Sequence, residues 1–202
     1  REGFMESVRV VRLIGSIERV AKDLEGYLLP ETYSFPKGIS SGEAVAAMVG
    51  QFRATFGDPW TARAESLRMS VRQIVTLASL IEKESSVAEE NRLVSAVFHN
   101  RLRIGMKLDC DPTIIYALKE KDLFDGDLTK KDMSLDSLYT TYRYPGLPPG
   151  PICNPGREAI EAALYPAEES YLYFVSRNDG SHQFSRTFAE HQHAVHRFQK
   201  NR

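Results

Sequence analysis

Two glutamates at the end of an apolar run are the residues of this chain best placed to do chemistry. They lie in TLASLIEKESSVAEE, residues 76–90, whose apolar spacing predicts a helix. On a helical wheel Ile81 lies at the centre of the apolar face, and Glu82 and Glu84 flank that face on opposite sides. Lys83 points away to water. One or both carboxylates should therefore be partly removed from solvent.

A carboxyl group in this position is expected to hold its proton more tightly than usual. The last turn of a helix exposes carbonyl oxygens that carry roughly half a negative charge, and burial also disfavours a carboxylate. A carboxylic acid that stays protonated near neutral pH suits general-acid catalysis. The alternative is a solvated helix end, with Lys83 or Arg92 paired to either acid. The pattern does not choose between Glu82 and Glu84.

The composition is that of an ordinary globular protein. The chain has 202 residues, 42% of them hydrophobic and 26% charged, with a formal net charge of -1. This balance lacks the basic excess that is typical of nucleic-acid binding. No window offers the ~20 apolar residues that a membrane helix needs. Cys110 and Cys153 have no metal-ligand spacing, so we expect no metal site. The two could pair in a disulfide, but because buried free cysteine is common we expect them to be small buried residues.

Capping signals divide the first half of the chain into helices. Ser40 and Glu43 form a capping box that starts one helix, which ends at Gly57. The segment DPW at residues 58–60 predicts a turn, and the helix with the two glutamates follows. A capping box of Ser86 and Glu89 should start a third helix, whose apolar stripe holds Val94, Val97, Phe98 and Leu102.

The second half of the chain mixes loops with a small sheet. Residues 105–157 are rich in Pro, Gly, Asp and Tyr and predict a long ordered loop. Asn154 and Pro155 fit the cap and first position of a short helix over 156–164. The segment YLYFVSRNDGSHQFS predicts a β-hairpin with an Asp-Gly turn. Thr187 and Glu190 should cap a last helix. The predicted fold class is α+β, helix-rich, with a small sheet.

Five motifs occur in an order and spacing that resemble one known family. They are LEGYLLPETYSF, LASLIEKESSV, VFHNRLRIGMKLDCDPTIIYAL, YRYPGLPPGPICNPG and YLYFVSRNDGSHQFSRTFAEH. Together they resemble the MltG (YceG-like) family of bacterial endolytic murein transglycosylases over about residues 24–195. The resemblance implies a catalytic domain at 24–202 with Pro/Gly-rich active-site loops, and a trailing part of a LysM-like region at 1–23. Asp109 and Thr140 depart from the family pattern, which has Gln and Asn there.

The resemblance assigns the chemistry to Glu84. This residue would protonate the oxygen between MurNAc and GlcNAc in a β-1,4 bond, and its carboxylate would then take the proton of the C6 hydroxyl. The result is a 1,6-anhydro ring, formed without cofactor and without the second carboxylate that most glycosidases need. The matching motifs supply residues for sugar binding: Asn100, Asp111, Thr113, Tyr139, Tyr142, Asn154 and His182. For each of these, a structural role as cap, turn or core residue remains the alternative.

Two other functions are open to this sequence. Relatives of the family have been labelled aminodeoxychorismate lyase, a pyridoxal-phosphate enzyme, but that chemistry needs a buried lysine and a phosphate loop. Lys83 faces solvent on the wheel, and no glycine-rich phosphate loop is present. The second alternative is a non-catalytic peptidoglycan-binding or scaffold module of the wall-elongation machinery.

The resemblance also implies a cellular setting. It implies a full-length protein anchored in the bacterial cytoplasmic membrane, with the catalytic part on the outer side. The expected partners are peptidoglycan strands and the peptidoglycan synthases of the elongation machinery. His191, His193 and His196 do not converge on one helix face, so we expect no metal there.

Overall fold

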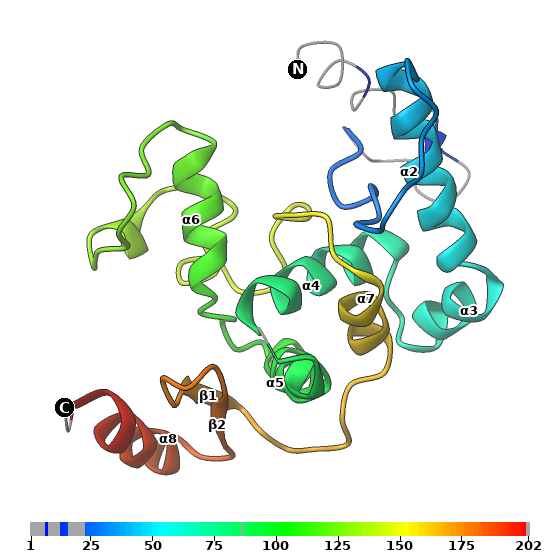
Figure 1. Ribbon diagram of the computed structural model, residues 1–202. Helices are drawn as coiled ribbons and strands as arrows, with labels where there is room; N and C mark the ends of the chain where they lie inside the picture. The colour runs from blue at the N-terminus through cyan, green and yellow to red at the C-terminus, as the bar shows by residue number, and fades with distance from the viewer. Residues whose placement is uncertain (1–6, 8–12, 16–22, 86, 201–202) are drawn as a thin grey trace. The chain divides into compact units, whose positions relative to one another are not determined.

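The chain divides into two compact units. The computed structural model describes residues 7, 13–15, 23–85 and 87–200 (Figure 1). The N-terminal unit comprises residues 1–79 and 150–164, and the C-terminal unit comprises residues 80–149 and 165–202. The division falls inside α4, which runs over Val71–Glu84. Among the described residues, no helix is both long and apolar enough to cross a membrane.

Helices α2, α3 and α7 and the first part of α4 build the N-terminal unit. Their bounds are Ser41–Thr55, Asp58–Ser66 and Arg157–Leu164 for the first three. Helix α2 begins at the predicted capping box, in which the Glu43 amide donates to Ser40 Oγ at 3.2 Å and the Ser40 amide donates to Glu43 Oε2 at 2.9 Å. Because Phe56 caps α2 at its other end, the predicted helix before Gly57 is confirmed.

A row of aromatic rings forms part of the core of the N-terminal unit. Tyr27 meets Phe52 edge to face at 5.3 Å, Phe52 stacks on Phe56 at 5.6 Å, and Phe56 meets Trp60 at 5.9 Å. The turn predicted at residues 58–60 is wrong, because these residues form the first turn of α3. Pro59 suits that position, since proline has its φ already set for a helix and its missing amide has no helical partner there.

Asn154 joins two segments of the N-terminal unit that are far apart in the sequence. Its Oδ1 accepts hydrogen bonds from the Gly26 amide at 2.8 Å and the Leu28 amide at 3.2 Å. Gly26 has φ +88°, and a Cβ added there would collide with the Pro151 ring. The predicted helix over 156–164 is confirmed as α7. The predicted cap at Asn154 is wrong, because α7 begins at Arg157 and the Asn154 side chain is turned to the other segment.

The C-terminal unit combines helices with one hairpin. Its elements after α4 are η2 (Ala88–Glu90), α5 (Asn91–Arg103), α6 (Asp111–Lys119), η3 (Asp132–Ser134), β1 (Tyr173–Ser176), β2 (His182–Ser185), α8 (Phe188–Val195) and the π-helix η4 (His196–Lys200). The predicted third helix is present as α5, but Ser86 of its capping box lies outside the described residues. The loop predicted over 105–157 is wrong in part, because α6 lies within it. Asp111 and Pro112 open this helix, as acidic residues and proline often do.

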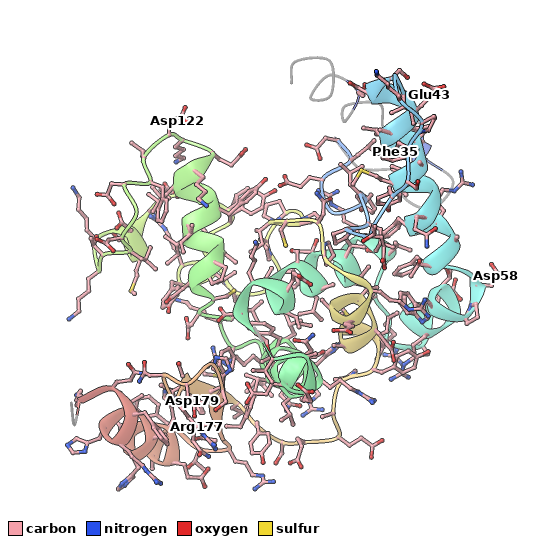
Figure 2. All side chains as sticks on the ribbon, in the orientation of Figure 1. Phe35, Glu43, Asp58, Asp122, Arg177 and Asp179 are labelled. Atoms are coloured by element: carbon pink, nitrogen blue, oxygen red, sulfur yellow. The ribbon has the colours of Figure 1, made fainter. Side chains whose placement is uncertain are left out.

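In the described residues the sheet consists of one antiparallel hairpin, formed by β1 and β2. Tyr173 pairs with Ser185 and Ser176 pairs with His182. Asp179 lies on the hairpin (Figure 2). It stabilises the turn between the strands, because its Oδ1 accepts from the Ser181 amide at 2.9 Å. Helix α8 starts at the predicted capping box of Thr187 and Glu190 and packs against both strands. The predicted hairpin and the α+β class are therefore confirmed. The domain boundary expected between residues 23 and 24 adjoins undescribed residues and stays a prediction.

Candidate active site

Glu84 is the last residue of α4, and the structure separates it clearly from its neighbours. Leu80 and Ile81, one turn earlier, are fully buried. Glu82 and Lys83 are exposed, whereas Glu84 is partly buried. Burial raises the pKa of the Glu84 carboxyl to about 7, from a usual value of 4.5. The structure thus distinguishes the two glutamates that the sequence pattern leaves equal.

Three charged or polar neighbours modify this effect of burial on the Glu84 pKa. The Cys110 thiol beside the carboxyl lowers the Glu84 pKa, because a hydrogen-bond donor stabilises the charged form. The negative charge of Asp111 raises the Glu84 pKa, and the positive charge of Arg101 lowers it. The balance leaves Glu84 able both to give and to take a proton near neutral pH.

Two buried threonines hold Cys110 in place. The Cys110 amide donates to Thr141 Oγ1 at 3.0 Å, and Thr113 Oγ1 donates to the Cys110 carbonyl at 2.7 Å. The two hydroxyl oxygens are themselves 3.0 Å apart. Thr113 has no exposed surface. Its hydroxyl therefore supports the residue that contacts Glu84, and its predicted role in sugar binding stays a prediction.

Arg101 is a buried cation that the sequence reasoning missed. Its Nε donates to the Leu172 carbonyl at 2.6 Å and its Nη1 donates to the Leu108 carbonyl at 2.8 Å. It also forms an ion pair with Asp109 at 3.4 Å. A signal was present in the sequence, because Arg101 lies four residues after Val97 and so falls on the apolar stripe of that helix. Arg101 thereby joins α5, the chain before β1 and the turn that leads to Cys110.

Asp111 and Tyr142 form a second contact of the site. The Tyr142 hydroxyl donates to Asp111 Oδ1 at 2.6 Å. Burial and this hydrogen bond raise the Tyr142 pKa well above its ordinary range, so the phenol keeps its proton. Both residues interact electrostatically with Glu84. Asp111 and Tyr142 are therefore two residues predicted to bind sugar that also interact electrostatically with the predicted catalytic glutamate.

Asn100 and Tyr139, also in the C-terminal unit, contact other parts of it. Asn100 Nδ2 donates to the carbonyls of Glu169 and Tyr171 at 2.8 and 2.9 Å, and its Oδ1 accepts from Arg103 at 2.9 Å. The Tyr139 ring lies 4.7 Å from the ring of Tyr116. These contacts give both residues a structural role. Whether they also touch a sugar stays a prediction.

His182 is held by a glutamate that the sequence reasoning missed. Its Nδ1 lies 2.7 Å from Glu90 Oε2, and its amide donates to Glu90 Oε1 at 3.0 Å. The partners are 92 residues apart in the sequence, so no local pattern indicates the pair. Asn154, the remaining predicted residue, belongs to the N-terminal unit and bonds to Gly26 and Leu28 there.

The described residues contain no group of three or more His, Cys, Asp or Glu side chains that could hold a metal ion. The His191 ring stacks on Tyr173 at 5.1 Å, while His193 and His196 are exposed. Cys110 and Cys153 are both free thiols; Cys110 is buried as expected, whereas Cys153 is only half-buried.

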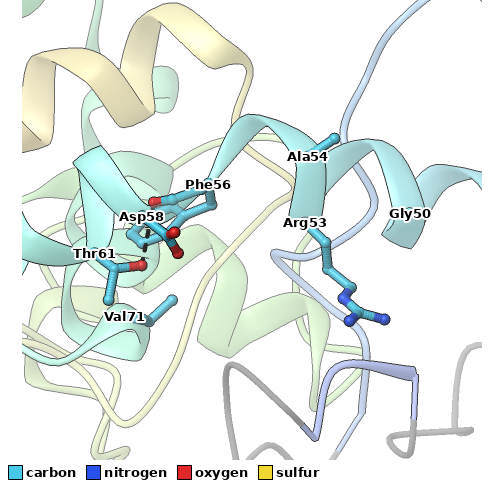
Figure 3. A pocket seen from close by; sticks show the side chains of 8 residues that line it. Gly50, Arg53, Ala54, Phe56, Asp58, Thr61 and Val71 are labelled. Carbon is cyan, nitrogen blue, oxygen red and sulfur yellow. Dashed lines mark hydrogen bonds between the residues drawn. The ribbon is translucent and has the colours of Figure 1, made fainter.

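A hollow in the N-terminal unit offers no comparable chemistry. It has a volume of about 550 Å³ and lies where α2 ends and α3 begins (Figure 3). Arg53 and Asp58, its charged lining residues, are exposed, and the Thr61 hydroxyl donates to the Gly57 carbonyl at 3.2 Å. The predicted site residues are not part of its lining.

Comparison with known proteins identifies the relatives of this chain. The model of the YceG-like family matches residues 5–197. The endolytic murein transglycosylase of Bacillus subtilis is 37% identical over 183 residues, which are 90% of this chain and 49% of that protein. The endolytic murein transglycosylase of Streptococcus pneumoniae serotype 2 is 32% identical over 76% of this chain and 28% of its own length. The chain thus spans about half the length, or less, of these curated relatives.

A solved structure agrees with this result. The crystal structure of a yceG-like protein from Listeria monocytogenes is 34% identical in sequence and superposes with a TM-score of 0.79, covering 94% of this chain and 65% of that one. The family match covers nearly all of the chain, and the fold match covers a similar share. The chain therefore belongs to the YceG-like family.

Proposed function

We propose that this protein is an endolytic lytic transglycosylase that cuts the glycan strands of bacterial peptidoglycan. Similar proteins from Bacillus subtilis and Streptococcus pneumoniae are named endolytic murein transglycosylases. The observation that carries the proposal is the carboxyl of Glu84, whose pKa burial raises to about 7 beside Cys110, Asp111 and Arg101. An acid of this kind can act as donor and acceptor of a proton in one catalytic cycle.

In the first step, Glu84 acts as a general acid. The protonated carboxyl gives its proton to the glycosidic oxygen between MurNAc and GlcNAc, and the bond from that oxygen to C1 of MurNAc breaks. Positive charge develops on the sugar ring, and the Glu84 carboxylate is formed at the same time. The nearby carboxylate-bearing residue Asp111 adds negative potential in this region, which favours the developing positive charge.

In the second step, Glu84 acts as a general base. The carboxylate takes the proton of the C6 hydroxyl of the same MurNAc, and the hydroxyl oxygen bonds to C1. The products are a 1,6-anhydro-MurNAc end and a free GlcNAc end, and Glu84 has its proton back. Because the nucleophile belongs to the substrate, no attacking water and no second carboxylate are required.

The test is product analysis with a matched pair of variants. The protein is incubated with uncrosslinked peptidoglycan strands, and the products are identified by mass spectrometry. We expect anhydro-ended fragments, which are about 18 mass units lighter than hydrolytic products of the same composition because no water is added. Glu84→Gln should lower the rate by at least about a hundredfold, whereas Glu82→Gln, two residues away and exposed, should keep it.

Two results would reject the proposal. Full activity of Glu84→Gln would show that another group transfers the proton. Binding of the strands by the unaltered protein without any cleavage would favour the alternative of a peptidoglycan-binding or scaffold module.

The substrate also suggests where the reaction occurs. We propose that it occurs on the outer side of the bacterial cytoplasmic membrane, with synthases of the elongation machinery as neighbours.

A further inference from the structure

We propose that Glu90 is a positioning residue that holds the proton of the neutral His182 ring on Nδ1, so that Nε2 accepts a hydrogen bond from an acetamido N–H of the glycan strand. This inference rests on the proposed function, because it takes the peptidoglycan strand as the ligand. It adds a role for Glu90, a tautomer for His182 and the chemical group of the sugar that His182 recognises.

Glu90 contacts His182 through both of its carboxylate oxygens. Oε1 accepts from the His182 backbone amide at 3.0 Å, and Oε2 lies 2.7 Å from Nδ1 of the ring. An ionised carboxylate can only accept, so the proton in the contact with the ring belongs to Nδ1. Because a neutral imidazole carries one N–H, Nε2 keeps its lone pair and is an acceptor.

The His182 ring is held in one orientation, and its second nitrogen is open to a ligand. The His182 side chain is only 11% exposed, and its ring meets Phe174 edge to face at 5.4 Å and Phe184 at 6.3 Å. No described residue forms a hydrogen bond with Nε2. The fully buried polar atoms without a partner in the described part of the chain do not include Nε2, which therefore reaches the surface.

The pair ties the hairpin to the segment that follows the candidate acid Glu84. Within this segment, Ser85 Oγ donates to the Val87 carbonyl at 2.8 Å, and the Glu90 amide donates to the same carbonyl at 2.9 Å. The segment is therefore compact, and Glu90 holds His182 beside it. An endolytic enzyme cuts within a strand, so sugars continue on both sides of the cut and are available to a neighbouring acceptor.

A fixed acceptor is useful only against a group that cannot change its own role. A sugar hydroxyl both donates and accepts, so it can adapt to either tautomer of a histidine. The acetamido N–H of GlcNAc and MurNAc can only donate. Holding the ring proton on Nδ1 therefore favours the acetamido group over a hydroxyl as the partner of Nε2 and makes His182 a specificity-determining residue.

Replacement of Glu90 by glutamine should reverse the tautomer. The His182 backbone amide can only donate, so the single amide oxygen of glutamine is required there. The glutamine NH₂ group then faces the ring and donates to Nδ1, which moves the ring proton to Nε2. In this variant Nε2 is a donor and opposes the acetamido N–H.

Nuclear magnetic resonance of the ring nitrogens tests the tautomer directly. The ¹⁵N shifts of His182 are recorded in the pH range in which the ring is neutral, and the signals that disappear in His182→Phe identify this ring. We expect the proton on Nδ1 in the unaltered protein and on Nε2 in Glu90→Gln. Glu89→Gln is the matched control, because Glu89 is the exposed neighbour of Glu90, and it should leave the proton on Nδ1.

A binding measurement connects the tautomer to the ligand. A short soluble fragment of uncrosslinked GlcNAc–MurNAc strand is titrated against the same variants in a Glu84→Gln background, so that the fragment is not cut. Glu90→Gln should raise the Kd by about tenfold or more, because two donors then face each other. Glu89→Gln should leave the Kd unchanged.

The outcomes separate this inference from the proposed function. A ring proton on Nε2 in the unaltered protein, the same tautomer in Glu90→Gln, or an unchanged Kd in that variant overturns the role of Glu90. The tautomer of the unaltered protein is decisive even if a variant fails to fold. If the tautomer and the Kd change as expected but the protein with Glu84 intact cuts no strand, the positioning of His182 stands and the proposed function fails.

Discussion

Replacing Glu84 by glutamine should change how the stability of the protein depends on pH. In the folded chain the Glu84 pKa is about 7, whereas the usual value for a glutamate is 4.5. Between these two pH values the folded state binds the Glu84 proton more tightly than the unfolded state does. The free energy of unfolding therefore falls as the pH rises through this window, and glutamine, which does not titrate, removes that fall.

The size of the effect follows from the interval between the two pKa values. A tenfold change in a proton equilibrium corresponds to about 1.4 kcal/mol, so the interval from 4.5 to about 7 corresponds to about 3 kcal/mol. Because Glu84 is only partly buried, this value is an upper limit. Relative to the unaltered protein, Glu84→Gln should thus gain up to about 3 kcal/mol on going from about pH 4 to about pH 8.

Denaturant unfolding followed by circular dichroism measures this difference. Unfolding free energies of the unaltered protein, Glu84→Gln and Glu82→Gln are compared at about pH 4, 6 and 8. The Glu82→Gln curve should run parallel to that of the unaltered protein, because the Glu82 side chain is exposed. If the difference between Glu84→Gln and the unaltered protein is the same at all three pH values, the argument that burial keeps Glu84 protonated is refuted.

Two further substitutions test the contacts that hold the N-terminal unit together. Asn154→Ala should lower the free energy of unfolding by about 1–3 kcal/mol, because the amides of Gly26 and Leu28 lose their acceptor. Asn154→Asp keeps an acceptor oxygen and should lower the free energy of unfolding by less. Equal losses in both variants would contradict this account. Gly26→Ala should cost more than about 2 kcal/mol, because Gly26 has φ +88° and its new methyl would meet Pro151. Gly50→Ala on α2, where a Cβ meets no other atom, should instead be neutral or stabilising by up to about 1 kcal/mol; urea unfolding of the pair measures the contrast.

Local signals in the sequence predicted a large part of the fold. The capping boxes at Ser40–Glu43 and Thr187–Glu190 are both present, because such a box needs only residues three positions apart. The hairpin around Asp179 and Gly180 is likewise encoded by a short turn and its flanking strands. The errors at residues 58–60 and in α6 share a cause: Asp-Pro is typical of turns and loops, but it also opens helices.

The candidate site was predictable only in part, because its contacts join distant segments. The pattern placed Glu82 and Glu84 beside the apolar face but could not say which one becomes buried. Tertiary packing decides that question, and it also brings the Glu84 carboxyl under the influence of Cys110 and Asp111 at the start of α6. The pair of Glu90 and His182 depends on the tertiary fold in the same way. By contrast, the burial of Arg101 could be predicted from the sequence, because a charged residue on an apolar stripe indicates a buried ion that needs partners.

The chain passes from one unit to the other after Ser79, after Pro149 and again after Leu164. Neither unit can therefore be excised as one continuous stretch of polypeptide. During synthesis on the ribosome, the Gly26 amide can gain its acceptor only after Asn154 has been added to the chain. At roughly 5–20 residues per second, this delay lasts many seconds. Any truncation that ends before α7 leaves both halves of the molecule incomplete, so fragments made for biochemical work should retain the chain through the last helix.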